Sequence, residues 1–582
     1  MKKLYLMLSM LFAFGAAANA VPAKKLQKVI TLTNGTQVSV ELRGDEYLSW
    51  WEGTDGTAYR ATADDAVFEA FDLEAQKPAA AARRARAEQG RVARLARVKN
   101  SLKGADDKMR GLGGDHITYK GVKKGLVVLV DFKNKKFADG HDLEYYKNVI
   151  NGKDFSDEEE GYVGSVRDYF LAQSNGQFEL DFDVVGPVTM SKNYGYYGND
   201  GAYQKDEKVY EMIKEACDGI QDKVNLKDYD WDGDGEADQV FFLYAGLGQA
   251  SGGSAGTIWP HESELRYWPC GVLSYPTGKI NTYACANELQ PETQGSSRYI
   301  SAGIGTICHE FSHCLGFADM YDTTGGGGYG MSVFDVMDQG SYNGNGFVPC
   351  NYTAFERIYA GWVEPIELID PATVKDMKSV SDYGRPFIMY NYKNTNEYFL
   401  LENRQNTGWD EGLYGSNGLL IVHVNYVPSR WANNSVNSSA EKIQCCTVVN
   451  ADGSRENTQY SLQGDLYPYE VKGVTMNDEF TDESEPAAKL YTKNSDNSYA
   501  LGIPITQIKR SKGSVSFLVC GGDDKNVIDN TFNGVVDGIN GVTVANKATD
   551  NRIYSIDGRY LGTDASALGK GIYVVGGKKI VK

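Results

Sequence analysis

Two of the six histidines in this chain stand four residues apart, and this spacing restricts the local fold more than any other feature. His309 and His313 share one face of a helix, because residues i and i+4 are neighbours on a helical surface. Glu310 follows the first histidine and can reach a water molecule held near both rings. Zinc prefers two neutral imidazoles and an oxygen ligand, with a fourth position open to water. The motif therefore predicts a zinc site on a helix, with Glu310 as general base.

The third zinc ligand is expected shortly after this helix. Gly316 can adopt a positive φ without steric cost, so it can end the helix and turn the chain back towards the metal. Asp319 then arrives as an oxygen ligand. Glu356, in a later helical segment, is the alternative third ligand. Asp322 is interpreted as a turn residue or as a hydrogen-bond partner of a ligand.

The motif and the sequence after it resemble a known family of proteases. His309, Glu310, His313, Gly316 and Asp319 match the extended zinc motif of the metzincin clan in its aspartate-ended form. Residues 334–344 resemble the Met-turn of the immune-inhibitor-A-type secreted metallopeptidases, which implies that Met337 lies beneath the metal as an apolar floor. Other segments that resemble landmarks of that family are 168–176, 258–261, 360–362, 402–405 and 418–423.

This resemblance covers residues 119 to about 430. It implies an α/β zincin catalytic domain, peptidase activity, and Asp319 rather than Glu356 as the third ligand. Tyr342 follows the Met-turn-like segment and could donate a hydrogen bond in the site, although an aromatic packing role is favoured for it.

The N-terminal part of the chain predicts an export signal and a removable segment. Residues 1–20 have the basic, apolar and small-residue order of a signal peptide, with cleavage expected after Ala20. Residues 21–118 are interpreted as a pro-segment that begins with a β-rich unit, because apolar and polar residues alternate on both sides of Asn34-Gly35. The Ala- and Arg-rich stretch from Ala79 to about Arg110 is expected to be an exposed helix or linker, either a spacer or a protease-sensitive joint.

The remainder of the chain divides by its patterns. Residues 119–365 interleave strand and helix patterns, as in an α/β domain. Residues 366–522 are rich in strand patterns, 523–546 form a polar linker, and 547–582 predict a small β unit. The expected fold class is a multidomain protein, in which an α/β zincin (metzincin-like) catalytic domain is flanked by an N-terminal β-rich pro-segment and C-terminal β-rich domains.

The last segment resembles the sorting domain of type IX secretion in Bacteroidetes proteins. The match covers residues 553–560 and 569–579, where apolar strand patterns are separated by Gly-containing turns. It implies the type IX secretion machinery as a partner. The alternative is a small β-domain that closes the protein.

A second acidic cluster has the spacing of a calcium loop. Asp230, Asp232, Asp234 and Asp238 occupy positions 1, 3, 5 and 9 of an EF-hand-type loop, with glycine at position 6. Phe241 stands at position 12, so the usual bidentate glutamate is missing. We expect a calcium site completed by other ligands, and the alternative is an acidic turn without an ion.

Charge and cysteine placement exclude several other functions. The net charge of −18 disfavours nucleic acid and anionic lipid as partners. No later apolar run reaches the roughly 20 residues that a membrane span needs. Residues 21–119 contain no cysteine, so a pro-segment there cannot cap zinc with a thiolate. A carboxylate such as Asp115, or steric cover, would have to maintain latency, although Gly-Gly-Asp is also an ordinary turn.

These observations together predict a zinc endopeptidase, secreted or at the cell surface after export through the periplasm. Its partners would be protein or peptide substrates and its own pro-segment, acting as an inhibitor in a latent precursor. The alternative is a catalytically silent surface protein that keeps a zincin scaffold and binds protein or glycan. The presence of Glu310 favours catalysis, because a purely structural zinc site needs no general base.

Overall fold

The computed structural model describes most of the chain in two units, Met1–Val535 and Val536–Lys582. No helix among the described residues is long and apolar enough to cross a membrane. Most of the predicted signal peptide and the predicted latency residue Asp115 lie outside the described residues. The described ranges are 18–62, 64–101, 119–200, 205–293, 296–324, 328–413, 417–438, 443–456, 459–532, 553–555, 560–562, 572–575 and 578–581.

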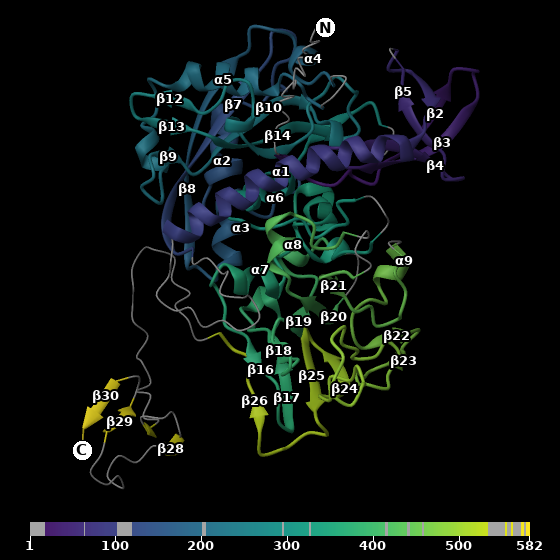
Figure 1. Ribbon diagram of the computed structural model, residues 1–582, viewed down its shortest axis with the longest axis vertical. Helices are drawn as coiled ribbons and strands as arrows, with labels where there is room; N and C mark the ends of the chain where they lie inside the picture. Colours follow the sequence, from purple (N-terminus) through teal and green to yellow (C-terminus); the bar gives the residue numbers. More distant parts are fainter. Residues whose placement is uncertain are drawn as a thin grey trace, which may run out of the picture. The chain divides into compact units, whose positions relative to one another are not determined.

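A mixed sheet forms the centre of the first unit (Figure 1). Four strands run parallel, and the short strand β11 (His261–Glu264) pairs antiparallel with the outermost of them, β14 (Thr282–Pro291). The next strand beyond β11 is β1, which comes from the N-terminal end of the chain. In spatial order the strands are β1 (Ala18–Asn19), β11 (His261–Glu264), β14 (Thr282–Pro291), β10 (Val240–Leu247), β7 (Gly121–Asp131) and β8 (Phe178–Thr189), with β15 (Tyr299–Ser301) paired to β14.

The continuous apolar run in β7 is explained by burial on both faces of the sheet. Val127 and Leu129 face a core formed with α2 (Leu143–Asn151), α3 (Val166–Gln173) and α6 (Gly305–Cys314). Val128 and Val130 face a second core formed with α5 (Val209–Ile220). Parallel strands covered on both faces carry apolar residues at successive positions rather than alternating ones. Helix α6, which carries the histidine motif, therefore lies in one covering layer.

A small closed barrel precedes this domain. It contains β2 (Gln27–Leu32), β3 (Gln37–Gly44), β4 (Ser49–Gly53), β5 (Ala58–Ala61) and β6 (Val67–Ala70). The predicted hairpin is present, because β2 and β3 pair antiparallel around Gly35, which has a φ of +81°.

The Ala- and Arg-rich stretch forms the long helix α1 (Leu73–Ser101), which leaves the barrel and contacts β1 and α8 (Pro428–Ala432) (Figure 1). The expectation of an exposed helix is wrong at Arg91, whose side chain is buried. Its guanidinium donates to the carbonyl oxygens of Gly316 at 2.9 Å and Trp431 at 3.3 Å. These contacts tie α1 to the catalytic domain, since a buried cation needs polar partners.

The β-rich region after residue 365 shares a core with the α/β domain. One face of its five-stranded sheet packs against a four-stranded sheet, and the other face joins the core around α3, α6 and α7 (Ala354–Tyr359). The first sheet contains β16 (Ile366–Glu367), β18 (Phe387–Tyr390), β19 (Glu397–Arg404), β20 (Gly418–Asn425) and β21 (Cys446–Val448). The second contains β24 (Ile505–Ser511), β25 (Ser514–Val519), β17 (Ala372–Met377) and β26 (Val527–Ile528).

The linker predicted for residues 523–546 begins later than its polar composition suggests. Strand β26 pairs in parallel with β17. The side-chain amide of Asn530 donates to the carbonyl oxygens of Lys378 and Arg385, and Phe532 packs against the large core. The pairing of β26, the side-chain amide of Asn530 and the packing of Phe532 therefore extend the folded region to residue 532.

The second unit contains a small antiparallel sheet where the sequence predicts strands. Its order is β28 (Tyr560–Gly562), β27 (Ile553–Ser555), β29 (Ile572–Val575) and β30 (Lys578–Val581).

A glycine allows the motif helix to approach the segment η5 (Gln339–Gly346) closely. A Cβ atom added at Gly305 would lie 1.8 Å from the carbonyl oxygen of Ser341, so Gly305→Ala requires backbone movement. We expect this variant to lower the free energy of unfolding by about 2–3 kcal/mol, measured by urea titration. Gly195→Ala in α4 (Tyr194–Tyr197) is the control, because its Cβ would meet no atom closer than 3.8 Å. Equal losses in the two variants would contradict the close packing of α6 on η5.

Candidate metal centre

Helix α6 holds the histidine motif inside the core. His309, Glu310 and His313 are completely buried, and the helix packs against β11, β14 and η5. The helix ends at Cys314, and Gly316 has a φ of +89°, which confirms the predicted left-handed turn. The chain then returns past the helix and brings Asp319, which is also completely buried, to the histidines.

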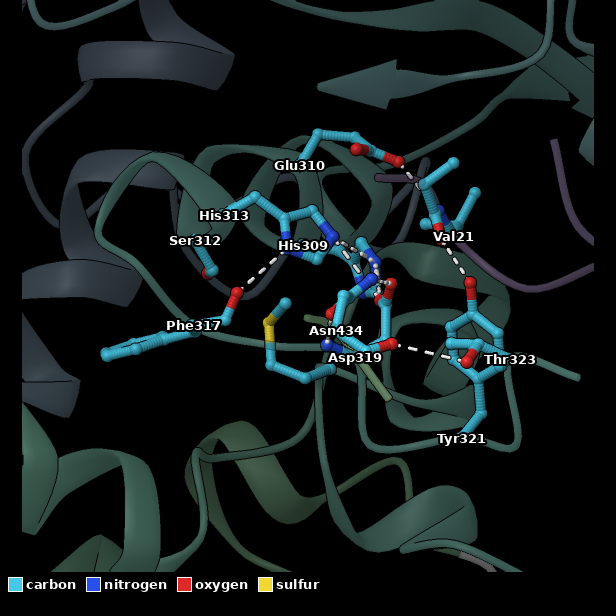
Figure 2. A network of polar contacts seen from close by, with 12 residues as sticks. Val21, His309, Glu310, Ser312, His313, Phe317, Asp319, Tyr321, Thr323 and Asn434 are labelled. Carbon is cyan, nitrogen blue, oxygen red and sulfur yellow. Dashed lines mark hydrogen bonds and ion pairs between the residues drawn. The ribbon is translucent and has the colours of Figure 1, made fainter. Parts of the chain in front are cut away.

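Three potential ligand atoms meet at this point (Figure 2). The Oδ1 atom of Asp319 lies 3.2 Å from Nε2 of His309 and 3.3 Å from Nε2 of His313. The two Nε2 atoms are 3.2 Å apart. Glu310 is adjacent, since it offers an oxygen within 4.8 Å of the ligand atoms of both histidines.

Backbone carbonyls fix the orientation of both imidazoles. Nδ1 of His309 lies 2.8 Å from the carbonyl oxygen of Val336, and Nδ1 of His313 lies 2.9 Å from that of Phe317. A carbonyl oxygen can only accept, so each Nδ1 carries a hydrogen atom. A neutral ring with hydrogen on Nδ1 has its lone pair on Nε2, and both lone pairs therefore point towards Asp319.

Asn434 positions the carboxylate from a distant part of the chain. Its Oδ1 accepts the backbone N–H of Asp319 at 2.7 Å, and its Nδ2 donates to Oδ2 of Asp319 at 2.5 Å. Asn434 follows α8 and has a φ of +51°. The sequence gives no sign of this role, because an asparagine at a helix end indicates only a turn.

The pKa values of the two carboxylates are shifted in opposite directions. Burial alone would raise the pKa of Asp319, but the two adjacent histidines lower it below its ordinary value. Burial raises the pKa of Glu310 well above its ordinary value, and the nearby charge of Asp319 adds to this effect. Burial also lowers the pKa of His313, which favours its neutral form.

The N-terminal segment of the chain reaches this centre. The backbone N–H of Val21 donates to Oε1 of Glu310 at 2.8 Å, and Figure 2 shows this contact beside the histidines. Strand β1, just before it, pairs with the edge strand β11. Ala20 and Val21 are completely buried. No sequence pattern indicates this contact, which joins residues 289 positions apart.

The donor set at the centre fits a zinc ion. Two neutral imidazole nitrogens and one carboxylate oxygen are the ligands that zinc accepts in catalytic sites. Among the described residues, Oδ1 of Asp319 receives no hydrogen bond, although it is completely buried. A cation held by His309, His313 and Asp319 would compensate this buried charge.

Other predicted residues lie elsewhere in the fold. Met337 is buried in the same large core, one residue after the carbonyl that holds His309. Glu356, the alternative third ligand, accepts a hydrogen bond from the Thr353 hydroxyl, and burial raises its pKa to about 7. Asp322 accepts the backbone N–H groups of Thr324 and Gly328, as expected for a turn residue.

The acidic loop brings together three of its four predicted ligands. Asp230, Asp232 and Asp238 each offer an oxygen within 4.8 Å of the others. Asp234 instead accepts the backbone N–H of Glu236. Burial, together with repulsion from Asp232 and Asp230, raises the pKa of Asp238 to about 7. Such a cluster favours a bound cation over three mutually repelling charges.

Parts of the chain are similar to known metallopeptidases. Residues 122–363 match the family model described as immune inhibitor A peptidase M6, catalytic domain. The chain is 29% identical over 269 residues to the pre-pro-metalloprotease PrtV of Vibrio cholerae, which covers 39% of this chain and 28% of PrtV. It is 27% identical over 319 residues to immune inhibitor A of Bacillus thuringiensis subsp. alesti, which covers 45% of each protein.

A third relative is a putative secreted metallopeptidase of Arthroderma benhamiae, 26% identical over 213 residues, which covers 31% of this chain and 30% of that protein. The aligned segments thus span less than half the length of each of these relatives. The resemblance is to metallopeptidases, and the family match contains α6, Asp319 and Glu310.

The assignment of the third ligand can be tested by zinc content. Asp319→Ala should reduce the zinc retained after dialysis from about one per chain to near zero, because two imidazoles alone hold zinc weakly. Plasma mass spectrometry of the purified protein measures this directly. Glu356→Gln is the matched control, since it changes a buried carboxylate outside the centre and should keep the zinc. The reverse pattern would transfer the ligand role to Glu356.

Proposed function

We propose that this chain is a secreted zinc endopeptidase with a metzincin-like catalytic domain that hydrolyses peptide bonds of extracellular proteins. The proposal rests on one observation: the ligand atoms of His309, His313 and Asp319 lie close together in the core, beside Glu310. It lies inside the segment that matches a peptidase catalytic domain. The fully buried glutamate supports catalysis, because a structural zinc site would not need it.

The chemistry follows from the positions of the side chains. When bound, zinc would lower the pKa of a coordinated water molecule and polarise the substrate carbonyl group. Glu310 accepts a proton from the attacking water and then donates it to the departing amine. The carbonyl oxygens of Val336 and Phe317 accept the Nδ1 hydrogens of His309 and His313, which leaves Nε2 of each ring available as a ligand atom. Asn434 holds Asp319 in its ligand orientation.

The N-terminal region would keep the enzyme latent until it is removed. Support comes from the contact between Val21 and Glu310, from the pairing of β1 with β11, and from the buried Arg91 that joins α1 to Gly316. The N-terminal segment would therefore occupy the place where a protein substrate has to bind. After the expected cut at Ala20, residues 21–24 would keep the centre occupied, and a role of Asp115 in latency is a separate hypothesis.

The proposal includes export and a structural calcium ion. The relatives named above include one described as secreted, and the first 20 residues have the pattern of a signal peptide. The C-terminal resemblance suggests the type IX secretion machinery as the export partner. Calcium would be held by Asp230, Asp232 and Asp238, in the loop immediately before β10.

The catalytic role of Glu310 is tested by an isosteric change. Glu310→Gln should lower casein hydrolysis by at least about 1,000-fold, because the amide cannot take the proton from water. Zinc content should stay near that of the unchanged protein, since the three ligands are retained. Hydrolysis by processed wild-type protein should also stop with a chelator. If processed wild type and Glu310→Gln are equally inert with zinc bound, the chain is a silent scaffold and the proposal is wrong.

Processing in the Ala- and Arg-rich stretch should release activity. Active protein is expected to begin between Arg83 and Met109, because cleavage there separates the barrel and residues 18–24 from the catalytic domain. N-terminal sequencing of active material, compared with the inert precursor, measures this. The finding of Val21 as the N-terminus of fully active enzyme would show that this processing is not required.

A further inference from the structure

The segment Ala18–Lys24 crosses the candidate metal centre with its backbone held at several points. Ala18 pairs with Ser263 and Asn19 with Glu262, antiparallel to the edge strand β11. At the other end, the backbone N–H of Lys24 donates to the carbonyl oxygen of Ala250 at 3.0 Å. An extended peptide added to a sheet edge is a common way for a protein to hold a peptide ligand.

Two side chains bracket one peptide bond of this segment. The Tyr321 hydroxyl donates to the carbonyl oxygen of Ala20 at 2.7 Å. The nitrogen of the same bond, from Val21, donates to Oε1 of Glu310 at 2.8 Å. Figure 2 shows Glu310 and Tyr321 on opposite sides of Val21, next to the two histidines and Asp319.

Hydrolysis of a peptide bond needs a group at each of these two positions. The carbonyl oxygen gains negative charge in the transition state, so a donor placed there stabilises it. The nitrogen must receive a proton to leave as an amine, and Glu310 is the proposed proton carrier. The bond between Ala20 and Val21 has both groups in place.

The residues after this bond are also held by the catalytic domain. The indole Nε1 of Trp259 donates to the carbonyl oxygen of Val21 at 3.1 Å, and the Tyr342 hydroxyl donates to that of Pro22 at 2.7 Å. Val21 belongs to a buried apolar cluster with Ala250 and Trp259. A β-branched aliphatic side chain after the bond therefore fits, whereas a charged one would be buried without a partner.

We infer that residues 18–24 lie in substrate register and that Tyr321 is a catalytic residue that donates to the carbonyl oxygen of the hydrolysed bond. The inference rests on the proposed function and adds a substrate class, namely peptides with a small aliphatic residue such as valine after the cleaved bond. In the reaction, a water oxygen adds to the carbonyl carbon and the carbon–nitrogen bond breaks. A water proton passes through Glu310 to the nitrogen, which gives a carboxylate and an amine.

The bracketed bond has a second predicted role in the life of the chain. The bond between Ala20 and Val21 is also the bond at which the export signal is expected to be cut. After that cut, the nitrogen next to Glu310 would be a terminal amine, as in the product of the reaction.

Steady-state kinetics of the processed enzyme test the role of Tyr321. The substrate is an internally quenched peptide that carries the sequence of residues 18–24, Ala-Asn-Ala-Val-Pro-Ala-Lys. Wild type should cut it between Ala and Val. Tyr321→Phe should lower kcat by about 100-fold or more, with KM within threefold and zinc content unchanged, because one transition-state donor is lost. Tyr342→Phe is the matched control, and it should raise KM with kcat within threefold.

A readout without turnover uses the intact full-length chain. In the Glu310→Gln background, Val21→Asp should decrease hydrogen-exchange protection of the β11 amides at residues 261–264, because a buried unpaired charge would release the segment. Val29→Asp is the control, since Val29 is 63% exposed in β2, and it should leave this protection unchanged.

The outcomes separate the two proposals. If processed wild type cuts neither casein nor the peptide, the proposed function fails. If it cuts casein but cuts the peptide at another bond, or if Tyr321→Phe retains the wild-type kcat, the proposed function stands and this inference is overturned.

Discussion

Three electron-pair donors lie close together in the core without access to solvent, and the surrounding structure has to hold them there. Two imidazole nitrogens and a carboxylate oxygen lie within 3.3 Å of one another where water does not reach. Without a cation, this arrangement would concentrate negative potential in a medium of low dielectric constant. With zinc, the same burial strengthens every ligand bond and keeps the geometry fixed. The cost of burying these groups explains why so many other contacts hold them in place.

Those contacts come from both the α/β domain and the β-rich region. Val336 and Phe317 fix the imidazole rings, Asn434 fixes the carboxylate, and Gly305 lets the segment after Met337 lie directly on the motif helix. Asn434 belongs to the β-rich region, which also shares the large core with α3, α6 and α7. The β-rich region therefore helps to support the candidate metal centre. This dependence also explains why its sheet is apolar on both faces.

The sequence predicted the local features of the site and missed the long-range ones. The i, i+4 spacing of His309 and His313 and the turn at Gly316 depend on a few neighbouring residues, and both are present. The position of Asp319 near both histidines was predicted from the turn at Gly316 and from the resemblance to the metzincin zinc motif. Asn434 and Val21 could not be predicted, because their contacts depend on how distant segments pack. The successive apolar residues in β19 and β20 are typical of strands buried on both faces, but they do not indicate which core lies on each face.

X-ray absorption at the zinc edge of the purified full-length protein tests the central claim most directly. Cys308 and Cys314 flank the histidines on α6, so a thiolate-bound zinc is the informative alternative. The account predicts one zinc per chain with nitrogen and oxygen neighbours at about 2.0–2.2 Å, including the signature of two imidazoles. A shell of sulfur atoms at about 2.3 Å, or a protein that binds no zinc at all, would contradict it.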